Sequence, residues 1–462
     1  MKDTAAQQEK APNEEHKGTA KAQSVEQKDR AKEQKAREKE RRKKERAERR
    51  ALRRYRFAFA FFRLVMTPFI KLKFRFRYDS LKKIKGPYLL LANHNMEMDP
   101  ILLGIAAGRQ AFFVASEHIA RKGFGTWFLM RYFHPILHRK GKDGTRSVMT
   151  ILKTLRSGSS VALFPEGNRS FDGVTCPIPE ATGKMAKHAG VPLITYRFEG
   201  GYLTQPRFSL TLRKGRVTGH LVHVYQPEEL RKMTDEEVNA AIVADLHEDA
   251  YEAQEREKIA FKGKKLARGI ESTLYRCPKC GAYGTLVSDD TTVRCDCGYE
   301  AEYDVYGYLG GETMRDLNAA QRDALRQRLW DAMAQGPESD GQNDACLWKS
   351  AAMQADMAEP SGDTDQAADG IFRDTVTVRR IGADHEVLWS REGAISANRS
   401  GVYITGEQGE PIRVNELAVY SRNAIAAHCT EELVAYDIRG DERFCALKYL
   451  HLHEEVQAVR KA

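Results

Sequence analysis

Two polar motifs directly follow apolar runs in the first half of the chain, and the first contains a histidine and an aspartate. His94 and Asp99 belong to NHNMEMDP (93–100), which lies between the apolar runs YLLLA and PILLGIAAG. An imidazole titrates near pH ~6.5, and a carboxylate on its second nitrogen fixes the tautomer and stabilises the imidazolium. The spacing therefore favours a general base, His94, supported by Asp99. Asp followed by Pro is also a good helix start, so Asp99 can serve both roles.

The second motif, FPEGNRS (164–170), comes directly after the apolar run SSVALF. Gly167 allows a sharp turn off a strand. Arg169 offers a planar fork suited to a phosphate, and Glu166 can accept hydrogen bonds from a hydroxyl or hold that arginine. Because loops at strand ends carry the sites of α/β proteins, the two motifs predict one site for a polar, anionic substrate.

A third cluster consists of Cys277, Cys280, Cys295 and Cys297, which are four of the eight cysteines. The pattern CPKCG, then CDCG, resembles a zinc ribbon with one knuckle tightened to Cys-x-Cys. Four thiolates suit a closed structural zinc site, so we expect zinc to stabilise the ribbon and to take no part in catalysis. The absence of a visible secretory signal favours a reducing compartment.

The surrounding pattern predicts an α/β fold with a central, largely parallel sheet flanked by helices, because strand-like and helix-like segments alternate from 88 to 225. A long helix is expected over 234–260, where a Thr and two acidic residues open a helical apolar spacing. We expect a first folded domain at 57–260, a ribbon at 272–306 and a helix at 312–334. A polar linker is expected at 335–370, and a β-rich domain at 371–462 that resembles a pleckstrin-homology-like fold.

The N-terminal residues 1–56 carry most of the net charge of +10, with 20 Lys and Arg against 11 Asp and Glu. They contain almost no large apolar side chain, so we expect a disordered or single-helix basic arm. The apolar segment that follows, 57–70, is shorter than the roughly 20 residues that span a bilayer. It is therefore expected to lie at a membrane interface.

Together, NHxxxxD and FPEGxRS resemble the PlsC-like lysophospholipid and glycerol-phosphate acyltransferases, and we suspect a bacterial member. The resemblance runs from about 57 to 225 and includes Pro135-Ile136 with Arg139, and Val191-Pro192-Leu193. It implies that His94 is the base and Asp99 its support, and that substrate phosphate and glycerol are bound by Arg139, Glu166, Gly167, Asn168, Arg169 and Ser170. Met96 and Asn168 depart from the family's usual Ser and Thr.

The resemblance implies transfer of a fatty acyl group from acyl-CoA or an acyl carrier protein thioester to a lysophospholipid, with 1-acyl-sn-glycerol-3-phosphate as the expected acceptor. It also implies peripheral attachment to an anionic membrane on its cytoplasmic face. Neither motif supplies a cysteine nucleophile or a Gly-x-Ser-x-Gly elbow, so no covalent acyl-enzyme is expected. Alternatives from other classes are a nucleic-acid-binding protein using the ribbon and arm, and a membrane scaffold. The arm lacks aromatics for base stacking, and His94, Asp99, Glu166 and Arg169 are all present.

Overall fold

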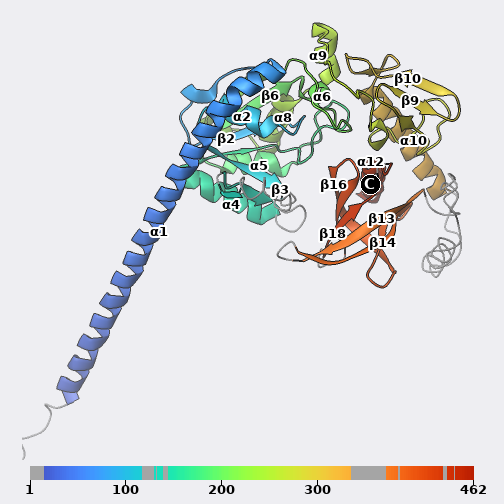
Figure 1. The fold of residues 1–462 in the computed structure, drawn as a ribbon. Coiled ribbons are helices and arrows are strands. Elements are labelled where there is room, and N and C mark those ends of the chain that lie inside the picture. The colour runs from blue at the N-terminus through green and yellow to red at the C-terminus, as the bar shows by residue number, and fades with distance from the viewer. Residues whose placement is uncertain are drawn as a thin grey trace, which may run out of the picture. The chain divides into compact units, whose positions relative to one another are not determined.

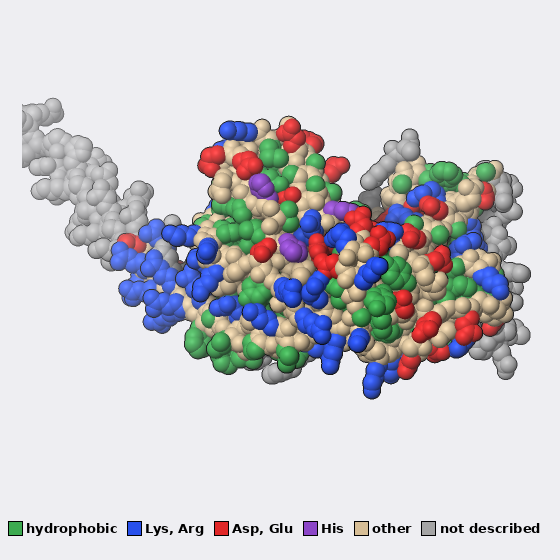
Figure 2. All heavy atoms as spheres, turned by 90° about the horizontal axis from the view of Figure 1, so that it is seen from above, with side chains coloured by type: hydrophobic (Ala, Val, Ile, Leu, Met, Phe, Trp, Pro, Cys, Tyr) green, Lys and Arg blue, Asp and Glu red, His purple; other side chains and the backbone are tan. Residues whose placement is uncertain are grey.

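The computed structural model describes residues 15–116, 130–131, 133–138, 144–334, 371–382, 386–429, 434–441 and 443–461. The chain divides into two units, Met1–Ala58 and Phe59–Ala462. The described part of the first unit is helical and belongs to α1, Glu15–Phe74. Figure 2 shows Lys and Arg side chains crowding this part of the helix. The polar linker expected at 335–370 lies outside the described residues.

The second unit contains a seven-stranded sheet in the order β1-β7-β6-β2-β5-β3-β4 (Figure 1), in which every neighbouring pair except β6–β7 is parallel. The expected α/β architecture with a largely parallel sheet is therefore confirmed. The strands are β1 Arg77–Tyr78, β2 Leu89–Ala92, β3 Ala111–Ser116, β4 Ile136–His138, β5 Ser160–Leu163, β6 Leu193–Glu199 and β7 Thr218–Tyr225.

Helices cover both faces of this sheet, which explains why β2 is a continuous apolar run that is buried throughout. Leu90 and Ala92 pack with the end of α1 and with α2, Asp99–Ala107. Leu89 and Leu91 face the opposite way, toward α4, α5 and α8. These three helices span Gly144–Arg156, Ala181–His188 and Asp235–Leu246. The short helices α6, Gly201–Thr204, and α7, Pro227–Leu230, complete this region.

The last turns of α1 have two different faces. Ile70 and Phe74 are completely buried in the core beside β2. The opposite face is an apolar stripe that is exposed to solvent. The stripe consists of Phe61, Leu64, Val65, Phe69 and Leu72. Across the described ranges, no helix combines the length and apolar character needed to cross a membrane.

The single long helix expected over 234–260 is wrong in one respect, because two helices fill this range. Helix α8 begins with the expected capping box between Thr234 and Glu237 and ends at Leu246, whereas α9 spans Ala250–Glu257. Between them, the Glu248 N–H donates to Thr175 Oγ1 (2.8 Å) and its carbonyl accepts from Thr175 N (3.0 Å). These cross-links hold an extended break that apolar periodicity alone does not reveal.

The cysteine-rich region forms the three-stranded antiparallel sheet β10-β9-β8 and the hairpin β11–β12. Its strands are β8 Val287–Ser288, β9 Thr292–Cys295, β10 Tyr299–Glu302, β11 Tyr308–Leu309 and β12 Glu312–Thr313. Helix α10, Met314–Ala334, follows directly.

The C-terminal region is a closed barrel of six antiparallel strands followed by α12, Ala446–Lys461 (Figure 1). The expected β-rich domain is thus confirmed, and its closure comes from the pairing of β13 with β18. The strands are β13 Phe372–Ile381, β14 Val387–Asn398, β15 Gly401–Thr405, β16 Pro411–Ser421, β17 Ala424–Cys429 and β18 Val434–Arg439. Closure leaves no unpaired sheet edge to protect.

Candidate active site

His94 lies at the carboxyl end of β2 with its ring held on two sides. Its Nδ1 is 2.9 Å from Asp99 Oδ2, and the ring stacks on Phe164 with centroids 4.5 Å apart. The His94 side chain is 21% exposed, whereas that of Asp99 is fully buried. Because the carboxylate accepts the Nδ1 proton, the lone pair is assigned to Nε2. The geometry is that of a fixed imidazole base with one nitrogen left for a substrate.

Asp99 shapes the loop as well as the ring. Its Oδ2 also accepts hydrogen bonds from the backbone N–H groups of Asn95 (2.6 Å) and Met96 (2.8 Å). The N-cap of α2 is Met98, and Asp99 is the first helical residue, followed by Pro100. The expected helix start is present, but the aspartate carboxylate is turned back to the loop and makes no cap bond inside the helix.

Glu166 joins the two sequence motifs. Its Oε1 accepts from His94 N (2.6 Å) and its Oε2 accepts from Cys176 N (2.7 Å). The side chain is buried, and that burial raises the pKa of Glu166 to about 8, against the lowering effect of the two N–H donors. Ser170 N adds a bond of 2.9 Å to the His94 carbonyl, so the two motifs form one unit.

Arg169 lies in this unit as a nearly buried cation, with 15% of its side chain exposed. Its Nη2 is 3.4 Å from Glu97 Oε1, an exposed carboxylate. Its Nη1 is buried and has no hydrogen-bond partner among the residues that the structure describes. Burial lowers the pKa of Arg169, and the charges of Glu97 and Asp99 oppose that shift. A buried donor without a partner is costly, so this nitrogen is available for an anion.

The other expected substrate residues differ in position. Gly167 is exposed and turns the chain with φ of 67°, and Asn168 is half-buried beside it. Ser170 is fully buried, and its Oγ donates to Val174 O and accepts from Gly173 N. Arg139 lies outside the described residues.

Sequence reasoning did not identify Glu248, which is buried and contacts Asn95 of the histidine loop. Its Oε2 accepts from Asn95 Nδ2 (3.2 Å), and the same amide nitrogen reaches Phe198 O at 3.3 Å. Burial raises the pKa of Glu248 well above its usual range, with nearby Glu199 adding to the shift. Little in the sequence indicated this contact, because Glu248 lies 153 residues after Asn95. The position of Asn95 next to His94 was the one indication that Asn95 has a role at the site.

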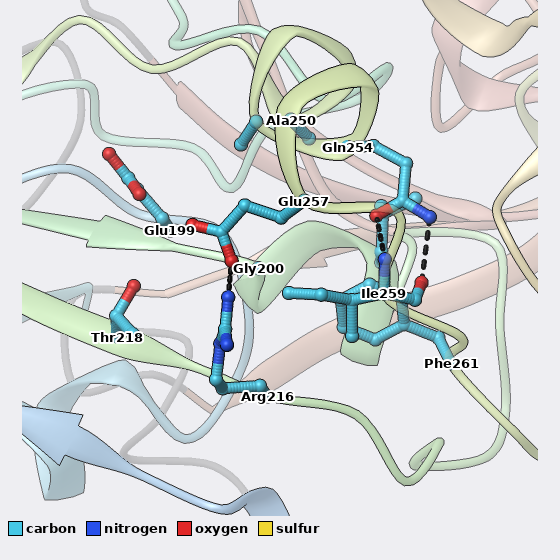
Figure 3. A pocket seen from close by; sticks show the side chains of 11 residues that line it. Glu199, Gly200, Arg216, Thr218, Ala250, Gln254, Glu257, Ile259 and Phe261 are labelled. Atoms are coloured by element: carbon cyan, nitrogen blue, oxygen red, sulfur yellow. Dashed lines mark hydrogen bonds and ion pairs between the residues drawn. The ribbon is translucent and has the colours of Figure 1, made fainter.

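A separate hollow lies beyond the end of β6 and does not include His94 (Figure 3). Within it, an ion pair joins Arg216 and Glu257, and Gln254 bonds the backbone of Ile259. A third lining side chain, Glu199, pairs with Arg197 and His220, and the charged groups of both motifs lie elsewhere. The candidate catalytic groups therefore lie at His94 and outside this hollow.

The four cysteines of the ribbon meet at one point, with their Sγ atoms all within 4.8 Å of one another. The Sγ atoms of Cys277 and Cys297 are 3.7 Å apart, and those of Cys280 and Cys295 are 3.9 Å apart. A tetrahedron with Zn–S bonds of about 2.3 Å has edges of about 3.8 Å. The cluster thus fits a zinc ion in size, donor type and number.

Comparison with known proteins finds a family model that matches the part of the chain with both motifs. Residues 73–199 match the family model described as Acyltransferase, which covers both motifs. The chain is also similar to the crystal structure of the 1-acyl-sn-glycerophosphate (LPA) acyltransferase PlsC from Thermotoga maritima. That similarity has 22% sequence identity and a TM-score of 0.33, and it covers 39% of this chain and 72% of that one.

Proposed function

We propose that this chain, which carries a PlsC-like acyltransferase domain, transfers a fatty acyl group from a thioester to the hydroxyl of 1-acyl-sn-glycerol-3-phosphate. The observation that carries the proposal is the union of a fixed base with an anion site. His94 and Arg169 belong to two motifs that are joined by Glu166 and by the Ser170 N–H. An acceptor with a hydroxyl near a phosphate would suit both groups at once.

In the proposed reaction, His94 Nε2 takes the proton of the acceptor hydroxyl while the oxygen attacks the thioester carbonyl carbon. A carbon–oxygen bond forms and the carbon–sulfur bond breaks. The imidazolium, stabilised by the Asp99 carboxylate at 2.9 Å, then returns the proton to the departing thiolate. No oxidant, metal or covalent enzyme intermediate takes part in this scheme. Coenzyme A and acyl carrier protein both supply such a thioester.

Phosphate recognition is assigned to Arg169, because its buried Nη1 lacks a partner in the described part of the chain. Arg139 is proposed as a second phosphate ligand on the resemblance alone. Glu166, Gly167, Asn168 and Ser170 would shape the loop that carries Arg169. An arginine that meets phosphate in the ground and transition states alike changes acceptor affinity more than turnover.

We also propose peripheral binding to an anionic membrane at the cytoplasmic face. The apolar stripe on α1 is exposed along its length, with Leu72 86% exposed. Lys71 and Lys73 lie in the same last turns, and the basic residues of the arm precede them. Apolar side chains that enter the acyl boundary, next to cations at the headgroups, are typical of interfacial helices.

The ribbon is proposed to hold one structural zinc ion. Cys277, Cys280, Cys295 and Cys297 would be its ligands, and zinc would cross-link the two knuckles. Gly281 and Gly298 support this assignment, because each follows a knuckle cysteine with φ above 75° and lets the chain fold around the thiolates.

The direct test is an acyl-transfer assay on the purified chain with a panel of donors and acceptors. Acyl-CoA and acyl-acyl carrier protein are each combined with lysophosphatidate, glycerol 3-phosphate and lysophosphatidylcholine. The proposal expects the highest kcat/KM with lysophosphatidate. Equal rates with a lysolipid that has a choline headgroup would contradict the acceptor assignment, and no product with any pair would contradict the function.

A further inference from the structure

The segment 169–174 contains the last two residues of the second motif and the four that follow, and it contacts parts of the chain that lie far away in the sequence. The connecting side chain is Arg207, which is almost fully buried. Its Nη1 donates to Arg169 O (3.0 Å), and its Nη2 donates to Val419 O (2.7 Å) in β16 of the barrel. One guanidinium therefore joins the backbone of the motif to the backbone of the C-terminal barrel.

Phe171 and Asp172, the next residues of the segment after Ser170, also contact the barrel and α10. The Arg207 guanidinium lies over the Phe171 ring, 4.1 Å from its centroid, and Phe171 packs against the hydrophobic core of the barrel. Asp172 Oδ2 accepts from Asn318 Nδ2 of α10 at 2.7 Å. Asn318 in turn accepts from Gln321, which donates to Thr273 O. The segment is thus held by the barrel on one side and by α10 on the other.

Burying the Arg207 guanidinium costs free energy, which argues against incidental packing as the origin of these contacts. Burial and, to a smaller extent, the charge of Arg169 lower the pKa of Arg207 to about 9. Among the described residues Arg207 forms no ion pair, although the charge of Glu97 favours its protonated form, and its Nε is buried without a hydrogen bond. An apolar side chain would fill the same space without removing a cation from water. The fork geometry has a specific use here, since it reaches two carbonyls that belong to different domains.

We infer that Arg207 is a positioning residue for the phosphate-binding loop, and that the barrel and α10 form the support against which it holds that loop. The inference rests on the proposed function for its kinetic consequence. Arg169 belongs to the braced segment, so loosening the segment would displace the phosphate ligand. His94 and Asp99 hold each other through their own hydrogen bond, and they would be affected less.

The test compares two buried arginines in the full-length chain. Arg207→Met keeps an apolar stem and removes both bridging donors. Arg213→Met is the matched control, because Arg213 is also buried, stacks on aromatic rings and donates to a backbone carbonyl, Leu266 O (2.6 Å). Arg213 does not contact the segment through any hydrogen bond that the described residues show.

Hydrogen exchange of the peptide covering 164–176 gives a readout that does not depend on activity. We expect faster exchange in Arg207→Met but not in Arg213→Met, and an acceptor KM raised by about tenfold with kcat within about threefold. Arg207→Lys should restore neither value, because one ammonium cannot reproduce the two-carbonyl fork. Asn318→Ala, which releases Asp172, should shift both readouts in the same direction and serves if Arg207→Met does not fold.

Unchanged exchange in this peptide in both Arg207→Met and Asn318→Ala would overturn the inference, as would an equal change in the Arg213→Met control. A general loss of kcat without a change in KM would also contradict it, because that pattern indicates a merely structural role. If the wild-type chain transfers no acyl group, the proposed function fails, and the exchange comparison still decides whether Arg207 positions the loop.

Discussion

The Asp99 carboxylate accepts three hydrogen bonds on one oxygen. A substitution can therefore remove its negative charge while keeping its shape and these hydrogen bonds. In Asp99→Asn, the amide oxygen can keep the bonds from His94, Asn95 and Met96, whereas the negative charge opposite the imidazolium is lost. A charge-assisted hydrogen bond contributes about 1.5–3 kcal/mol, so we expect turnover to fall by about 10- to 100-fold. Steady-state kinetics checks this, with circular dichroism as the folding control. Unchanged turnover would reduce Asp99 to a loop-shaping residue.

The buried Glu166 gives a prediction about pH. Its pKa is raised to about 8 in the folded chain. Between pH ~4.5 and ~8 the folded state therefore keeps a proton that the unfolded state releases, and stability falls as pH rises through this window. One group contributes at most about 1.4 kcal/mol per pH unit. Comparing unfolding free energies of wild type and Glu166→Gln across the window should show a shallower slope in the variant. Parallel slopes would contradict the assignment.

At this scale the sequence predicted the proximity of His94 and Asp99 but not the partners of Glu166. The proximity of His94 and Asp99 follows from a five-residue spacing on a strand–loop–helix turn, so local geometry was sufficient. Glu166 was expected to contact a hydroxyl or an arginine, and its oxygens instead bind two backbone N–H groups. Glu248 and Arg207 were missed, because only tertiary packing brings residues from beyond the motifs to the two loops.

Among the elements, the end of α1 makes the clearest prediction. Phe61 and Leu64 belong to the exposed apolar stripe, and burial of such a side chain contributes about 1.5–3 kcal/mol. Phe61→Ser with Leu64→Ser should therefore weaken co-sedimentation with anionic vesicles by at least about 100-fold. Leu210→Ser is the control, since Leu210 is as exposed as Phe61, at 61%, and lies outside α1.

Two outcomes would contradict the membrane proposal. Equal losses in the stripe variant and in Leu210→Ser would remove the special role of α1. Equally strong sedimentation of the wild-type chain with neutral and with anionic vesicles at low salt would remove the electrostatic part.

The ribbon makes a prediction about metal content. Purified chain should contain about one zinc per molecule by elemental analysis, because four thiolates complete a tetrahedral site. Cys277→Ser and Cys295→Ser should lose the metal and expose the 272–306 region to protease, whereas Cys429→Ser, in a buried barrel strand, should keep it. Metal-free wild-type chain, or unchanged protease resistance in the knuckle variants, would contradict the zinc proposal.

At the scale of the whole molecule, the sequence predicted elements in which polar and apolar residues repeat locally. It did not predict the contacts between domains. Alternation of polar and apolar residues in TVTVRRI, GVYITG and ELVAYDI indicated a β-rich C-terminal region, but no such segment marked β14, β16 or β17. Barrel closure depends on the pairing of β13 with β18, which are separated by more than fifty residues. The contacts of the barrel with the motif segment likewise have no local sequence pattern.

The central claim is that His94 is the base for acyl transfer to a phosphate-bearing acceptor. The most direct measurement compares kcat and acceptor binding for wild type and His94→Ala, using lysophosphatidate and an acyl thioester. Without the imidazole, the acceptor hydroxyl keeps its proton, and turnover should fall by about 100- to 10,000-fold. Acceptor binding should stay nearly unchanged, because Arg169 is retained. Near-normal turnover in folded His94→Ala would show that His94 is not the base and would contradict the mechanism.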